Sequence, residues 1–234
     1  APDTTDFSTT DYRPKLRLTN IGQISAGITA NRYGFGIGGG VNLLFSDALG
    51  DHLLGVVARI NGSYKDIGAE VAYANRDNRL NWGAALAHVP SLTASVDSYR
   101  DTLTIDSQRI ATEKRRFVRR RVYNEQVALS AEYPFSRNRR IDITGGYSHI
   151  WYQTREHSVH LFDGTVVKEH EGSTDSPRPL NLLHWSAAAV GDFSVTGLTA
   201  PVDGRRYRAE AELTTGSLNF ISLLLDYRHY KLLK

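Results

Sequence analysis

The sequence contains no cysteine and no methionine among its 234 residues. Without cysteine the chain cannot form a disulfide, a thiolate metal site or a cysteine nucleophile. The absence of thiols also fits an oxidising compartment. The formal net charge is only +3 and does not favour nucleic acid as a partner.

Long hydrophobic runs are also absent. No apolar stretch approaches the ~18 residues that a membrane-spanning helix needs, and the mean hydropathy is −0.36. This excludes only a helical span, because a spanning strand needs ~10 residues of alternating character and leaves a weak hydropathy signal. No secretory signal begins at Ala1, which indicates a mature product or an excised domain.

What the sequence does contain is a period-two alternation of apolar and polar side chains, which is typical of β-strands. In one segment Val127, Leu129 and Ala131 alternate with Gln126 and Ser130. The segments with this pattern are 16–28, 35–45, 54–64, 67–73, 80–86, 123–133, 141–151, 184–193, 206–213 and 221–228. The sequence therefore predicts an all-β, antiparallel up-and-down barrel of about ten strands, with a tail or linker over residues 1–11. A short helix near residues 107–116 is the one helical candidate.

The connections between these segments differ in length. The short, turn-like ones are 46–51, 75–79, 134–140 and 196–204, and the long ones are about 89–116 and 155–180. Up-and-down topology places both long loops at one end, and bacterial outer-membrane barrels combine short periplasmic turns with longer outside loops. Within the second long loop, Asp163-Gly164 predicts the tight turn of a small hairpin.

Aromatic residues concentrate near the ends of the predicted strands. One group comprises Tyr33, Phe35, Tyr64, Trp151 and Trp185, and the other comprises Phe45, Tyr73, Trp82, Tyr133, Phe193, Tyr207 and Tyr227. Amphipathic rings favour membrane–water boundaries, so this distribution predicts two aromatic girdles.

Alternation alone does not decide which face of the strands points inward. A soluble barrel would bury the apolar face, and it could bind an apolar ligand inside. The girdles and the loop lengths favour the opposite arrangement, in which the apolar face contacts lipid and the polar face lines a lumen. The residues expected to face that lumen are Arg59, Glu70, Arg206, Arg208, Glu210 and Glu212.

Several short stretches of the sequence resemble one known family. They are Tyr12-Arg13-Pro14-Lys15-Leu16, Ile21-Gly22-Gln23, Arg32-Tyr33-Gly34 through Gly38-Gly39-Gly40, Leu44-Phe45-Ser46-Asp47-Ala48-Leu49-Gly50-Asp51-His52, Asn81-Trp82-Gly83, Tyr133-Pro134-Phe135-Ser136, Gly204-Arg205-Arg206-Tyr207-Arg208 and Asp226-Tyr227-Arg228. They resemble the bacterial surface-antigen outer-membrane barrel found after TolB-like β-propellers, which is similar to the BamA-type barrel. The resemblance covers nearly the whole chain from about residue 12.

The resemblance implies a sixteen-stranded barrel, of which this chain would supply the first ten strands. It also implies a bacterial outer-membrane location, contact with lipid including lipopolysaccharide, and a role in inserting or moving proteins at that membrane. Further barrel strands or a β-propeller would be its partners. The family's Arg-Gly lid motif does not occur in the sequence. The chain is therefore expected to be either part of a larger barrel or a smaller barrel that closes by itself. A passive pore or a membrane anchor for a propeller is the alternative role.

The strongest charge cluster is Arg115, Arg116, Arg119, Arg120 and Arg121, together with Lys114. It lies where the first long loop returns to a strand, so a solvated loop base is one interpretation. The functional interpretation is contact with lipid phosphates of the outer leaflet, because guanidinium groups match phosphate geometry. Nucleic acid is not expected, because aromatic residues are sparse in the cluster.

Signatures of cofactor or metal sites are weak. Gly34-x-Gly36-x-x-Gly39 matches the dinucleotide fingerprint in its letters, but that mechanism requires a helix after the glycines, and the pattern here continues as a strand. His157, His160 and His170 with Glu169 would bind metal only if their loop brought them together. We predict neither a cofactor nor a metal.

Catalytic motifs are similarly absent. The sequence has no Gly-x-Ser-x-Gly and no His-Glu-x-x-His. Glu70, Glu125, Glu210 and Glu212 could pair as acids, but arginines on the same strands are expected to neutralise them. The sequence therefore predicts a membrane protein without catalytic residues.

Overall fold

The computed structural model describes residues 11–22, 24–31, 34–105, 108–198 and 200–231, so most of the expected tail and the rim aromatic Tyr33 lie outside the described residues. The strands are β1 (Arg17–Ile21), β2 (Ser25–Asn31), β3 (Gly34–Ser46), β4 (His52–Gly62), β5 (Ile67–Asn75), β6 (Asn81–Ile105), β7 (Gln108–Ser136), β8 (Arg139–Phe162), β9 (Thr165–Ser173), β10 (Leu180–Asp192), β11 (Val195–Thr196), β12 (Pro201–Gly216) and β13 (Phe220–Tyr230). A 3₁₀ turn, η1 (Tyr64–Asp66), joins β4 to β5. Among the described residues, no helix has the length and apolar character needed to cross a membrane.

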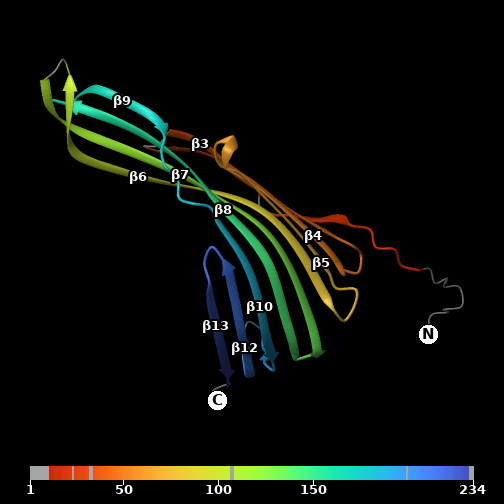
Figure 1. Cartoon of the computed structure of the whole chain (residues 1–234). Helices are drawn as coiled ribbons and strands as arrows, with labels where there is room; N and C mark the ends of the chain where they lie inside the picture. Colours follow the sequence, from red (N-terminus) through yellow and green to blue (C-terminus); the bar gives the residue numbers. More distant parts are fainter. Residues whose placement is uncertain (1–10, 23, 32–33, 106–107, 199, 232–234) are drawn as a thin grey trace, which may run out of the picture.

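All thirteen strands belong to one antiparallel sheet in which successive passes of the chain are neighbours (Figure 1). β1 and β2 pair with consecutive parts of β3, so they are two pieces of a single pass. β9 pairs with the distal part of β8, and β11 pairs with the start of β12. The remaining strands complete ten passes, which confirms the predicted all-β, up-and-down fold.

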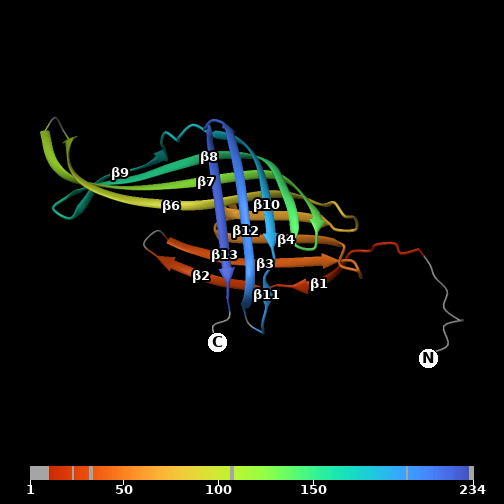
Figure 2. The ribbon, with the colours of Figure 1, turned by 90° about the horizontal axis from the view of Figure 1, so that it is seen from below.

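The sheet is open rather than closed. Within the described residues, β1 and β2 pair only with β3, and β13 pairs only with β12. The sheet curls across its width but leaves these strands as two free edges (Figure 2). These residues therefore form a curved wall, not a complete barrel.

The three longest strands are all much longer than a strand needs to be to cross a membrane. β6 has 25 residues, β7 has 29 and β8 has 24, whereas a tilted spanning strand needs ~10. Their distal parts, together with β9, form a projecting sheet that we call the extension: residues 89–105, 108–122, 152–162 and 165–173 (Figure 1).

The extension corrects the prediction of long loops at 89–116 and 155–180, because most of both ranges is paired strand. The helix expected near 107–116 was also wrong, since residues 108–116 form the first part of β7. Apolar and polar residues alternate only briefly in these segments, as over residues 92–97, and charged residues interrupt the pattern elsewhere, so the strand signal there is weak. The hairpin turn was right: Asp163 and Gly164 join β8 to β9 with φ of 48° and 77°.

Solvent exposure divides the sheet into two faces. Along β8, β10 and β12 exposed residues alternate with less exposed ones, and the apolar residues are on the more exposed side. Leu129 is 61% exposed and Leu223 is 76% exposed, while Asp142 on the other face is 8% exposed. The sheet is curved (Figure 2), and the polar face is the less exposed of the two, as expected of the concave side of a curved sheet. We call these sides the apolar face and the polar face.

Candidate functional site

The apolar face carries a continuous band of large side chains across the sheet. The register aligns Leu86, Val127 and Tyr147 on neighbouring strands, and Leu129 with Ala84. Further members of the band are Val71, Ile141, Ile143, Trp185, Leu213, Ile221, Leu223 and Leu225. Each has at least a third of its surface exposed, and no layer of the described residues covers them. An exposed apolar patch of this extent marks a contact surface for another apolar phase or partner.

Aromatic pairs lie at both ends of the band. Tyr123 and Trp151 stack with ring centroids 4.0 Å apart at the end that leads into the extension. At the opposite end, where short turns join the strands, the ring centroids of Tyr73 and Trp82 are 5.5 Å apart. The ring centroids of Tyr133 and Phe135 are 5.4 Å apart at the same end. Tyr123 and Tyr133 are ten residues apart on β7. At ~3.3 Å per residue and a tilt of ~40°, the band is ~25 Å high, which matches the apolar band of outer-membrane barrels.

The polar face is held by ion pairs between strands. Arg208 on β12 donates from Nη1 to Asp142 Oδ2 on β8 at 3.0 Å, and from Nε to Glu210 Oε2 at 2.8 Å. Arg140 donates to the other Asp142 oxygen at 2.8 Å. β10 lies between these strands, and its small Ala188, 3% exposed, lies in register between Glu210 and Asp142. The alanine leaves room for the arginine to cross over it.

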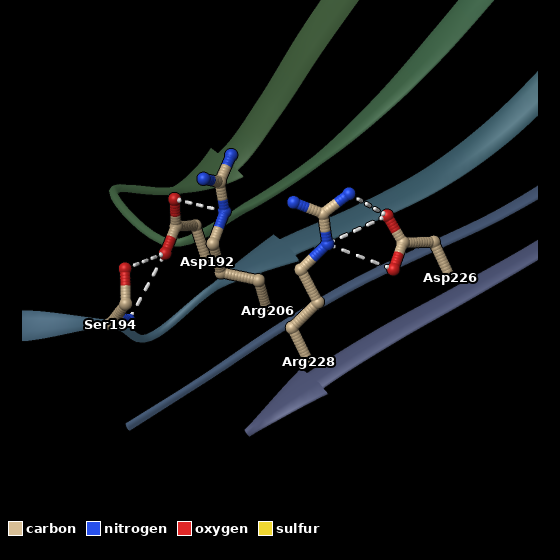
Figure 3. Close-up of polar contacts among 5 residues, drawn as sticks. All are labelled: Asp192, Ser194, Arg206, Asp226 and Arg228. Carbon is tan, nitrogen blue, oxygen red and sulfur yellow. Dashed lines mark hydrogen bonds and ion pairs between the residues drawn. The ribbon is translucent and has the colours of Figure 1, made fainter. Parts of the chain in front are cut away.

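All six residues expected to face a lumen share the polar face. Arg59 Nη2 lies 3.8 Å from Glu70 Oε2. Glu212 Oε1 lies 3.6 Å from His184 Nδ1. Arg206 Nε donates to Asp192 Oδ2 at 3.0 Å, and this pair lies beside Arg228–Asp226 near the turn end (Figure 3).

Asp192 also accepts hydrogen bonds from the amide and hydroxyl of Ser194, and Arg228 contacts Asp226 through Nε and Nη2 (Figure 3). The sequence pattern missed Arg140, because residues 134–140 read as a turn. Every basic residue of this face named here has a carboxylate neighbour. The arrangement offers fixed, mutually neutralised charge, which suits a hydrated wall.

The structure does not bring the five arginines of the basic cluster together on one face. Because residues of a strand alternate, Arg115, Arg119 and Arg121 continue the apolar face, whereas Arg116 and Arg120 continue the polar face. Three of the five form ion pairs: Arg115 with Glu113 at 2.9 Å, Arg116 with Glu156 at 2.7 Å, and Arg121 with Asp66 at 2.8 Å.

Two of these ion pairs shift the pKa values of side chains in the extension. The hydrogen bond from Arg116 holds the pKa of Glu156 below its ordinary value, and the same contact raises the pKa of Arg116. Hydrogen bonds from Arg115 and then Ser98 lower the pKa of Glu113. The extension is therefore stabilised by carboxylates that stay ionised to lower pH.

The candidate metal and acid groups do not converge. His157 and His160 differ by an odd number of positions on β8 and point to opposite faces; His157 pairs with Glu169 at 2.6 Å, and buried His160 contacts Thr112. The described residues contain no group of three or more metal-ligating side chains. Glu125 is on the apolar face, opposite to Glu210 and Glu212.

No protein-family model, no curated protein and no solved structure matches the chain. The chain forms a curved antiparallel wall with an exposed apolar band, a polar face of paired charges and a projecting extension.

Proposed function

We propose that the chain is part of the wall of a transmembrane β-barrel in the outer membrane of a bacterium. The observation that carries the proposal is the inverted exposure of the two faces. Bulky apolar side chains such as Leu129 and Leu223 are on the open side, while Asp142 and Ala188 are nearly covered. Lipid is the surrounding in which an apolar band ~25 Å high is stable on the outside of a sheet.

A soluble barrel with an apolar ligand inside requires the reverse arrangement. Its apolar side chains would fill the interior, and its charged side chains would face water. Here the ion pairs of Arg208 with Asp142 and Glu210 are on the side toward which the sheet curls. This observation favours the membrane arrangement over the soluble alternative.

The two free edges support a larger assembly. In hydrocarbon, every backbone N–H and C=O must be paired, so an open edge is not stable there. β13 is a long apolar edge strand, and β1 with β2 forms the other edge. We infer that partner strands cover both edges, as the resemblance to the sixteen-stranded surface-antigen barrel also implies.

The role of this barrel is proposed from the resemblance: inserting or moving proteins at the outer membrane. The exposed β13 edge supports it, because an unpaired edge can accept a strand of another chain. A passive pore, or an anchor for a propeller domain, is the second candidate. The mutually neutralised charges of the polar face are compatible with a water-filled bore.

Insertion is tested with vesicles whose acyl chains carry bromine, which quenches nearby tryptophan fluorescence. Trp82 and Trp185 are on the apolar face and about half exposed, so their emission should fall strongly when the chain is refolded into these vesicles. The W82F/W185F variant keeps only Trp151 at the rim and should be quenched less. Solubility without detergent and no quenching in the full chain would contradict a membrane location.

The two roles are separated by a second pair of measurements. An assembly factor should accelerate the insertion of an unfolded outer-membrane barrel into the same vesicles, compared with empty vesicles. A passive pore should instead give steady single-channel conductance and no acceleration. Equal insertion rates with and without the chain would contradict the assembly role.

A further inference from the structure

One pair of like charges in the extension has no carboxylate partner among the described residues. Arg119 on β7 and Arg155 on β8 are directly opposite each other in the register, with Ala94 and Ser173 as their outer neighbours. Directly opposed side chains have Cβ atoms ~5 Å apart, and two like charges at that spacing destabilise a sheet. The pair therefore favours the binding of an anion.

The charges around this pair are already engaged. On the same face, Arg121 is paired with Asp66, Arg115 with Glu113, and Glu169 with His157. Glu171, in register with His157, is another carboxylate on that face. Among the described residues, neither Arg119 nor Arg155 forms an ion pair with Glu171 or any other carboxylate.

The position of the pair relative to the aromatic rim is defined by the same strands. Arg119 and Arg155 are each four residues beyond the stacked Tyr123 and Trp151, on the side of the sheet that continues the apolar face. Four residues span ~13 Å along a strand, or ~10 Å along the membrane normal at a tilt of ~40°. Long arginine side chains can reach back toward the boundary, so their guanidinium groups fall in the headgroup region.

We propose that Arg119 and Arg155 form a binding site for the phosphate group of a lipid in the leaflet next to the extension. The inference rests on the proposed transmembrane location. Two guanidinium groups facing one phosphate satisfy its oxygens with charge-assisted hydrogen bonds and remove the repulsion between the arginines. The phosphate contact predicted from the whole basic cluster is thereby assigned to one member, Arg119, and to Arg155, which lies outside it.

The test measures binding of phosphatidic acid to the full chain in neutral detergent micelles by native mass spectrometry. The wild-type chain should retain phosphatidic acid in preference to phosphatidylcholine. The R119Q/R155Q variant should bind it at least about tenfold more weakly, because two charge-assisted contacts are lost. The matched control is R115Q/R116Q, which removes two charges from the same strand at arginines that already have carboxylate partners, and should change the affinity less than about twofold.

Three outcomes overturn the site. They are no preference for phosphatidic acid in the wild type, an equal loss of affinity in the control variant, and displacement of the lipid by equimolar inorganic phosphate, which would assign the pair to a free ion.

If R119Q/R155Q does not fold, phenylglyoxal labelling of the wild type replaces it. Phosphatidic acid should then protect Arg119 and Arg155 but not Arg120, and uniform labelling contradicts the proposal. Failure of the chain to insert into vesicles counts against the transmembrane location, which separates the two proposals.

Discussion

Strands β7 and β8 contain two regions that share one backbone ladder but differ in side-chain chemistry. In the wall, residues 123–133 pair with 141–151, and in the extension, residues 113–122 pair with 152–161, without a break in register between the two. In the wall, one face is mainly apolar, with Glu125 next to the aromatic rim as an exception, and the other face is mainly polar. In the extension, charged residues are on both faces.

This difference shows that backbone pairing and side-chain pattern respond to different things. Backbone hydrogen bonds of a strand ladder can form both in lipid and in water, so the ladder continues through both regions whatever surrounds them. Side chains respond to their surroundings, and their pattern changes at the stacked pair of Tyr123 and Trp151. The aromatic pair therefore marks where we propose that the hydrocarbon ends.

The largest expected effect comes from placing a charge on the apolar face of each region. Leu129→Arg puts a guanidinium near the middle of the band and should lower the free energy of unfolding by about 2–4 kcal/mol in vesicles. Val166→Arg, on the same face of the extension, should change it by less than about 0.5 kcal/mol, as surface substitutions do. Urea unfolding from vesicles measures both values. Equal losses at the two positions would contradict a membrane boundary between them.

A smaller difference is expected between the ion pairs of the two regions. Asp142 is nearly covered and forms ion pairs with Arg140 and Arg208. Asp142→Ala should therefore lower the free energy of unfolding by about 1–3 kcal/mol. Among the described residues, Glu156 forms an ion pair with Arg116 alone, in the extension. Glu156→Ala should lower the free energy of unfolding by at most about 1 kcal/mol. Double-mutant cycles with Arg208→Ala and Arg116→Ala isolate each pair. A larger coupling energy in the extension would reverse the comparison.

The smallest effect is the pH dependence of one ion pair in the extension. The pKa of Glu156 is lowered in the folded state from its ordinary value of 4.5, because Arg116 donates to it. The stability from this pair is therefore present above the ordinary pKa, and it is lost as the pH falls through the lowered folded pKa.

We accordingly expect Glu156→Gln to be less stable than the wild type at neutral pH, and the difference to shrink as the pH falls below 4.5. Unfolding free energies measured by urea titration from about pH 7 to about pH 3 test this expectation. The loss caused by Leu129→Arg should stay constant over the same range, because it involves no carboxylate. A Glu156→Gln difference that grows on acidification would contradict the assigned sign.

Much of the fold could be predicted from the sequence because one half-covered face imposes period-two alternation. Val127, Leu129 and Gln126 identify a strand without any knowledge of its neighbours. Asp163-Gly164 likewise identified its turn, since the positive φ angles of a tight hairpin select those residue types. The extension could not be predicted, because both of its faces carry polar and charged residues, including the buried Thr154, Ser158 and His160, so little alternation of apolar and polar residues marks its strands. For the same reason, the arginines at positions 115–121 read as a loop cluster.

The sequence by itself determined the strand segments of the wall, the short turns at one end and most of the wall residues that share a face, because these follow from local alternation and turn chemistry. Only the tertiary structure decided that the sheet curls toward its charged side, that Arg208 reaches Asp142 across Ala188, and that Arg119 opposes Arg155. The physical reason is that curvature and register depend on pairing between residues far apart in the chain, and no single strand carries that information.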